Sequence, residues 1–265
     1  MRLFDLDKFE EILQTITRNK TRSLLTAFGV FWGVFMLVFL MGGGEGFKRL
    51  MAKNFEGFAQ NSGFLGAGVT SIAYKGFNGG RTWSLKTSDV DLLKRRISGI
   101  GEATCLSSNF GIEVKYKNRS VNSPNLKGIL PNYRLIDSPK ISHGRFITES
   151  DLRQCRKVCV IGKQVAEELF PGVANPCGQF ISVGNIYYQI VGVNASTSSI
   201  GLMGSAQKSI CIPLSTMQRL YSLGQNVDVI CFTAKEGHTV TELEKPVENL
   251  IKRSTTSHPP TSRPL

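Results

Sequence analysis

Residues 23–44 read SLLTAFGVFWGVFMLVFLMGGG, a run of 22 residues without a charged side chain. A helix rising 1.5 Å per residue would be roughly 33 Å long over this run, which is about the thickness of the hydrocarbon core of a bilayer. A cleavable signal peptide has a shorter apolar region and an A-x-A-like cleavage site, and neither feature is present here. We therefore predict a retained membrane-spanning helix at 23–44 rather than a signal peptide or a buried core helix.

The segment before this run, residues 1–22, is predicted to form an amphipathic helix on the cytoplasmic side. Its apolar stripe consists of Leu6, Phe9, Leu13 and Ile16. Such a helix suits a membrane surface or a partner subunit. Five basic residues precede the apolar run and fewer follow it closely, so the positive-inside rule favours a cytoplasmic N-terminus.

Glycines mark the apolar run and its end. Residues 41–50, MGGGEGFKRL, look like a phosphate-binding loop, but they match neither G-x-x-x-x-G-K-[ST] nor G-x-G-x-x-G. We therefore predict no nucleotide site there, and a helical stalk at 45–60. Within the span, Gly29 and Gly33 form a G-x-x-x-G pair, which permits close packing against a neighbouring helix.

Composition argues against several functional classes. The net charge is +12, with most of the excess between residues 45 and 135, yet the basic residues are scattered and show no nucleic-acid-binding signature. Anionic lipid head groups are the expected opposite charge, with a solvated basic face as the alternative. The six cysteines lie in apolar contexts and the three histidines are isolated, so we expect free thiols, no metal site, no cofactor and no catalytic residue.

The rest of the chain predicts an α+β domain at 61–252 and a disordered tail at 253–265. Capping boxes are expected at Ser88/Asp91, at Thr148/Asp151 and at Ser215/Gln218. A buried strand is expected at RKVCVIG, a helix at KQVAEELF and a hairpin around Gly184-Asn185. Strands are also expected at 69–85, and a last helix at 239–252.

Four stretches resemble the MacB-type (FtsX-like) permeases of bacterial ABC transporters. They are RNKTRSLLTAFGVFWGVFML (18–37), HGRFITESDLRQCRKVCVIGKQVAEELFPGVANPCGQFISVGNIYYQIVGV (143–193), CIPLSTMQRLY (211–221) and VDVICFTAKEGHTVTELEKPVENLIKR (227–253). They occur in the family's order, and the resemblance extends over about residues 8–253.

The resemblance implies one span followed by a periplasmic domain at the inner membrane. The domain would have a porter-like α+β part, residues 61–109 and 216–252, and a β-rich insert at 110–215. Family members form dimers, and ATP hydrolysis would belong to a separate ABC ATP-binding subunit, so the chain itself is not expected to be an enzyme. A second permease, a periplasmic adaptor and membrane lipid are further candidate partners.

Family permeases carry three more spans after this domain, and the sequence contains no second apolar run. The expectation is therefore a truncated permease or a fragment of one. The alternative is a stand-alone membrane-anchored binding or adaptor module of the periplasm.

Overall fold

The computed structural model describes residues 20–54, 59, 61–67, 84–122, 124–196 and 201–257. It contains two compact units, Met1–Lys53 and Asn54–Leu265. Three predicted features lie outside the described residues: the stripe of Leu6, Phe9, Leu13 and Ile16, most of the strands expected at 69–85, and the end of the tail from residue 258.

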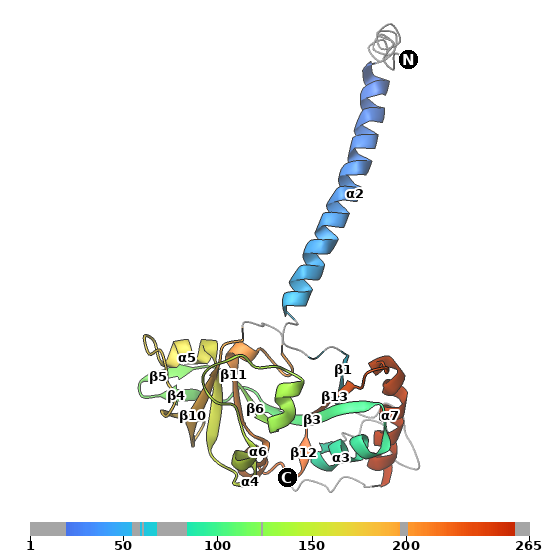
Figure 1. Cartoon of the computed structure of the whole chain (residues 1–265). Coiled ribbons are helices and arrows are strands. Elements are labelled where there is room, and N and C mark those ends of the chain that lie inside the picture. Colours follow the sequence, from blue (N-terminus) through green and yellow to red (C-terminus); the bar gives the residue numbers. More distant parts are fainter. Residues whose placement is uncertain are drawn as a thin grey trace. The chain divides into compact units, whose positions relative to one another are not determined.

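The first unit is represented by one long helix, α2 (Lys20–Asn54), which continues through all four glycines of the 41–50 stretch (Figure 1). Its segment Lys20–Lys48 is long and apolar enough to cross a membrane. Every large apolar side chain from Leu24 to Met41 is exposed, and a ladder of aromatic rings runs from Phe28 to Phe39. A helix that is apolar on all sides and has no protein cover is suited to lipid.

The second unit is built on an 11-stranded mixed sheet. The strand order is β1-β13-β3-β6-β11-β8-β10-β9-β4-β5, with β7 paired to β10. Most pairs are antiparallel, whereas β6 with β11 and β8 with β10 are parallel. The strands of this sheet are β1 (Ser62–Gly66), β3 (Ile100–Asn109), β4 (Val114–Tyr116), β5 (Arg119–Val121), β6 (Asn125–Ile129), β7 (Ile141–Gly144), β8 (Val158–Gly162), β9 (Phe180–Val183), β10 (Ile186–Asn194), β11 (Ser209–Pro213) and β13 (Val229–Ala234).

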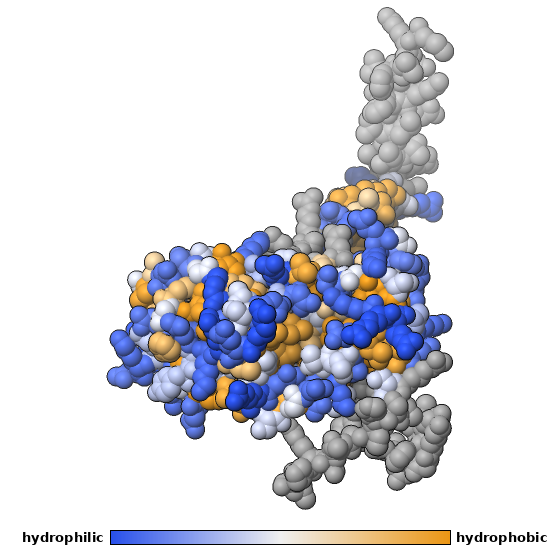
Figure 2. Space-filling model, turned by 60° about the horizontal axis from the view of Figure 1, so that its bottom comes forward, coloured by the Kyte–Doolittle hydropathy of each residue, from blue (hydrophilic) through white to orange (hydrophobic). Residues whose placement is uncertain are grey.

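A two-stranded sheet and several helices complete this unit. The small sheet pairs β2 (Leu85–Lys86) with β12 (Asn226–Val227). The helices are α3 (Thr87–Arg96), α4 (Glu149–Arg153), α5 (Lys163–Leu169), α6 (Leu214–Leu220) and α7 (Val240–Ser257), and the 3₁₀ turns are η1 (Pro131–Leu135) and η2 (Ala206–Lys208). Figure 2 shows one face of the unit, where hydrophilic side chains surround smaller apolar patches.

Side chains alternate between the two faces of the strands, and this alternation divides the core into three clusters. One cluster joins β3 and β13 to α3 and α7. A second joins β8, β9 and β10 to α5. The third includes Leu106 and Val160 and is covered by η1. In β3, for example, Cys105 belongs to the first cluster and Leu106 to the third, as the two-residue period of a strand requires.

The structure confirms several local predictions and corrects three. In one correction, residues 253–257 of the expected tail continue helix α7. The fold is an N-terminal apolar helix followed by an α+β domain, as expected. The hairpin around Gly184 and the capping box at Thr148/Asp151 are present. The capping box at Ser88/Asp91 was wrong by two residues, because α3 begins at Thr87 and Asp89 accepts the backbone N–H of Lys86.

The third correction concerns Ser215 and Gln218, which do not cap α6. Pro213 stands at the N-cap, and the Ser215 and Gln218 side chains bond to other elements, as described below. All six cysteines are free thiols, as predicted.

Candidate functional site

Helix α6 packs against two of the core clusters. Leu214 belongs to the cluster of α3 and α7, and Met217, one turn later, belongs to the cluster of α5. Beneath the helix, a Cβ added to Gly128 of β6 would lie 2.8 Å from Met217 Cβ, closer than real Cβ atoms approach. The helix therefore rests on the sheet without spare space.

Two hydroxyl groups of α6 hold the end of α4. Ser215 Oγ donates to the carbonyl of Leu152 at 2.5 Å, and Thr216 Oγ1 donates to the carbonyl of Arg156 at 2.9 Å. Leu152 lies in α4, where its carbonyl also accepts the Cys155 N–H at 3.2 Å, and Arg156 lies three residues beyond the end of the helix. The two hydroxyls therefore bind α6 to the C-terminal end of α4 and to the chain that follows it. Helices α4 and α6 lie side by side in Figure 1.

A side-chain amide of α6 binds to α3 and β12. Gln218 Nε2 donates to Thr87 Oγ1, in the first turn of α3, at 3.0 Å, and lies 3.4 Å from the Asn226 carbonyl of β12. Helix α6 thus connects α4 with α3 and β12. We call Ser215, Thr216, Gln218 and these partners the α6 junction.

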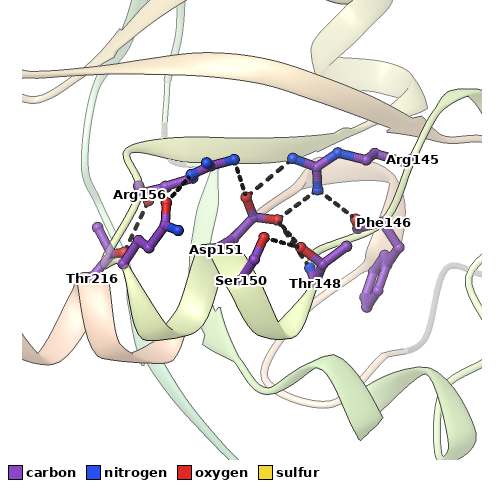
Figure 3. A network of polar contacts seen from close by, with 8 residues as sticks. Arg145, Phe146, Thr148, Ser150, Asp151, Arg156 and Thr216 are labelled. Atoms are coloured by element: carbon purple, nitrogen blue, oxygen red, sulfur yellow. Dashed lines mark hydrogen bonds and ion pairs between the residues drawn. The ribbon is translucent and has the colours of Figure 1, made fainter.

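A buried carboxylate fixes α4 itself (Figure 3). Asp151 has no exposed surface, and Arg145 donates to both of its oxygens, at 2.5 and 3.1 Å. The Thr148 N–H and hydroxyl donate to Oδ2 at 3.0 and 2.7 Å, and an Arg156 guanidinium nitrogen lies 3.7 Å from Oδ1. We call Arg145, Thr148, Asp151 and Arg156 the Asp151 cluster.

The donors of the Asp151 cluster overcome the cost of burying its carboxylate. Burial by itself would raise the pKa of Asp151, but hydrogen bonds from Arg145 and Thr148 lower it to about 2. The carboxylate is therefore ionised at any physiological pH, and the cluster stabilises the fold rather than transferring protons.

A second buried charge lies on the central strand β6. Lys127 is 2% exposed, and its Nζ donates to the carbonyl of Gly204 at 2.8 Å. Burial lowers the pKa of Lys127 and raises that of Asp137, while the two groups attract each other without a direct ion pair between them. Tyr133 donates its hydroxyl to Asp137 at 3.1 Å. We call Lys127, Tyr133 and Asp137 the Lys127 cluster.

Ala59, near the start of the second unit, is hydrogen-bonded next to this cluster. The Ala59 N–H donates to the carbonyl of Ile136 at 2.7 Å, and Ser62 Oγ bonds to the carbonyl of Ala59. Because Ile136 immediately precedes Asp137, the attachment lies one residue away from the Lys127 cluster.

The structure leaves the predicted packing residues untested. Apart from the backbone of α2 itself, no atom of the described residues lies within 4 Å of a Cβ added to Gly29 or Gly33, so both positions are open to a neighbouring helix. No group of three metal-ligating side chains occurs among the described residues. Sequence reasoning missed Lys127 and Arg145, since only their partners in the fold give them a role.

Comparisons with known proteins agree with this architecture. The sequence model of the MacB-like periplasmic core domain matches residues 23–250. Two relatives are named macrolide export ATP-binding/permease protein MacB. The protein from Bdellovibrio bacteriovorus is 26% identical over 94% of this chain, and that from Aggregatibacter actinomycetemcomitans is 27% identical over 93%. The chain spans 38% and 37% of their lengths.

Solved structures share the fold. The periplasmic region of MacB from Actinobacillus actinomycetemcomitans has a TM-score of 0.62 at 24% identity, covering 77% of this chain and 88% of that one. The extracellular domain of the transporter YknZ from Gram-positive bacteria has a TM-score of 0.54 at 16% identity, covering 66% of this chain and 83% of that one. Because the family model covers most of the sequence, the span included, the chain belongs to the MacB-like periplasmic core domain family of ABC transporter components.

Proposed function

We propose that the chain is part of an export permease that couples ATP use on a separate ATP-binding subunit to movement of its periplasmic domain. The observation that carries this proposal is the match over 23–250, which joins an exposed apolar helix and the domain in one family unit. The relatives' names combine ATP-binding and permease functions, and this chain spans 38% of the length of the Bdellovibrio bacteriovorus relative.

We infer that movement would enter the domain at Ala59. Because the Ala59 N–H is hydrogen-bonded to the carbonyl of Ile136, a displacement of α2 would change the positions of η1 and of the Lys127 cluster. From β6 it would reach α6 through Met217, which contacts the sheet at Gly128. The α6 junction would then move α3 and α4 together, and with them the porter-like part (61–109 and 216–252) and the insert (110–215).

The membrane segments have proposed roles of their own. Gly29 and Gly33 would pack against a second helix in a dimer or beside another permease, because small residues let helix backbones approach. Leu6, Phe9, Leu13 and Ile16 would seat the first helix on the cytoplasmic surface of the inner membrane. A periplasmic adaptor would complete an export assembly.

A reconstitution experiment tests the function. The 265-residue chain in nanodiscs should show neither ATP turnover nor transport, and after co-expression it should co-purify with a MacB-type ATP-binding subunit. Gly29→Leu with Gly33→Leu should weaken association of the span with other helices while membrane insertion remains, because Leu is favourable in lipid. ATP turnover by the chain alone would refute the proposal. Failure to retain the ATP-binding subunit would favour the stand-alone binding module.

Thiol labelling tests the orientation. In a background without the six native cysteines, an impermeant reagent applied outside the inner membrane should modify a cysteine placed at Ser123 and not one placed at Thr15. The opposite pattern would reverse the proposed topology.

A further inference from the structure

A hollow of about 490 Å³ lies between the β4–β5 hairpin and the chain that follows α5. We call it the hairpin hollow. Its lining residues are Tyr116, Lys117, Asn118, Arg119, Leu169, Phe170, Pro171 and Val173. Its volume falls in the range of ligand-binding clefts, roughly 300–1,000 Å³.

The floor of the hairpin hollow is aromatic and fixed. The rings of Tyr116 and Phe170 lie 4.2 Å apart between centroids, and Phe170 is 5% exposed. The Tyr116 hydroxyl donates to Gln179 Oε1 at 3.2 Å, which holds that ring in place. Val173, by contrast, is 52% exposed at the rim and offers apolar surface to a ligand.

The rim carries positive charge that has no acidic partner in the described part of the chain. Lys117 Nζ lies 5.3 Å from the centroid of the Tyr116 ring, and Arg119 makes no ion pair or side-chain hydrogen bond with the described residues. The neighbouring Lys115 differs, because it pairs with Glu113 at 2.7 Å. None of the lining residues is acidic. A ligand that fits must bring negative charge next to apolar surface.

Lys117 has φ +51°, in the left-handed region where glycine is preferred. The turn would therefore form at least as easily with glycine, so the backbone itself does not require a lysine here.

We propose that the hairpin hollow binds an extended acidic segment of a partner protein, with an aromatic or aliphatic side chain on the Tyr116–Phe170 floor and carboxylates at Lys117 and Arg119. A lipid surface calls for a cluster of about four to eight basic residues, and the hollow has two. A nucleic acid would require further cations along its backbone, yet Lys115 is already neutralised.

Fluorescence anisotropy with defined probes tests this proposal. The probes are a labelled acidic peptide, GEFDPDFEG, and its basic counterpart, GKFKPKFKG, titrated with the full chain in phosphatidylcholine nanodiscs. We expect the acidic peptide to bind with a Kd below about 1 mM. Lys117→Glu with Arg119→Glu should lower the affinity for the acidic peptide at least about tenfold through charge repulsion.

Two further variants separate binding from folding. Lys117→Gly should keep or raise the melting temperature, since glycine suits the turn. It should still lower the affinity for the acidic peptide about threefold, because it removes one positive charge. Lys235→Glu with Lys245→Glu makes the same change in net charge at two exposed lysines outside the hollow, and it should leave affinity within a factor of two or so.

Several outcomes would overturn the proposal. They are no saturable binding of the acidic peptide, equal binding of the basic peptide, or equal loss in the Lys235/Lys245 control. Anionic vesicles or a single-stranded DNA 10-mer that lose binding on the Lys117/Arg119 reversal, while the acidic peptide does not, would assign the hollow to lipid or nucleic acid instead. The proposed export function is unaffected by any of these results.

Discussion

The Asp151 cluster and the Lys127 cluster both bury a charge in the same domain, but they satisfy it very differently. Asp151 accepts a bidentate arginine, a backbone N–H and a hydroxyl, and its pKa is held at about 2. Lys127 makes one hydrogen bond, and burial lowers its pKa. The folded state therefore favours the charged form of Asp151 and disfavours the charged form of Lys127.

This difference indicates that the Asp151 cluster is rigid, whereas the Lys127 cluster can rearrange. Charge-assisted hydrogen bonds are roughly twice as strong as neutral ones, so the Asp151 cluster is expected to keep α4 in one position. The Lys127 side chain makes one hydrogen bond, so few contacts must break for it to move. The cluster also lies next to Ile136, which accepts the N–H of Ala59. If the domain changes shape during transport, we expect the change at the Lys127 cluster and not at Asp151.

Removing the acid from the Asp151 cluster should have the largest effect. Asp151→Ala removes a fully buried carboxylate and its charge-assisted hydrogen bonds from Arg145 and Thr148, and we expect a loss of about 2–3 kcal/mol in the free energy of unfolding. Urea denaturation of the unit Asn54–Leu265 measures it. Glu149→Ala, which removes an exposed carboxylate from the same helical turn, is the control and should cost little. A small loss at Asp151 would erase the contrast between the clusters.

The pH dependence of stability comes next in size. The pKa of Asp151 is about 2 in the folded chain and near 3.8 unfolded, so its contribution is complete above the unfolded value and is lost as the pH falls toward 2. The shift corresponds to roughly 2 kcal/mol. Denaturation midpoints between pH 6 and 2 should therefore fall less steeply for Asp151→Asn than for the wild type. An unchanged slope would assign the acid sensitivity to other groups.

A hydroxyl at the α6 junction should contribute less. Ser215→Ala removes the donor to the Leu152 carbonyl, and we expect a cost of about 1 kcal/mol. Because this contact joins α6 to α4, hydrogen exchange should increase in α4 more than in α7. Uniform exchange in the two helices would mean that the bond stabilises the fold without connecting its parts.

How far the sequence alone could predict these features depends on the range of the contacts. The Thr148/Asp151 box was predicted correctly because its partners are three residues apart. The same pattern at Ser215/Gln218 misled, since Ser215 finds its acceptor 63 residues away in α4 and Gln218 bonds to α3.

Long-range neighbours also explain what was missed. Nothing near Lys127 in the sequence indicates a buried lysine, because its partner Gly204 is 77 residues away. The apolar span needed no such information, because its length and lack of charge are local properties.

The smallest effect is expected where both charges of the Lys127 cluster are removed together. Lys127→Met with Asp137→Asn should change the free energy of unfolding by less than about 1 kcal/mol, because replacing a buried charge pair by uncharged residues of similar size is often neutral. The lowered pKa of Lys127 and the raised pKa of Asp137 both mean that the folded state disfavours these charges at neutral pH, and the double variant removes that penalty. The matched change at the other cluster, Arg145→Met with Asp151→Asn, should cost clearly more, since Thr148 and Arg156 then lose a charged acceptor. Urea denaturation of both double variants at pH 7 gives the comparison directly. If the Lys127/Asp137 variant proved the less stable of the two, the Lys127 cluster would contribute more to stability than the Asp151 cluster. The α6 junction would then be the place where we expect the domain to change shape.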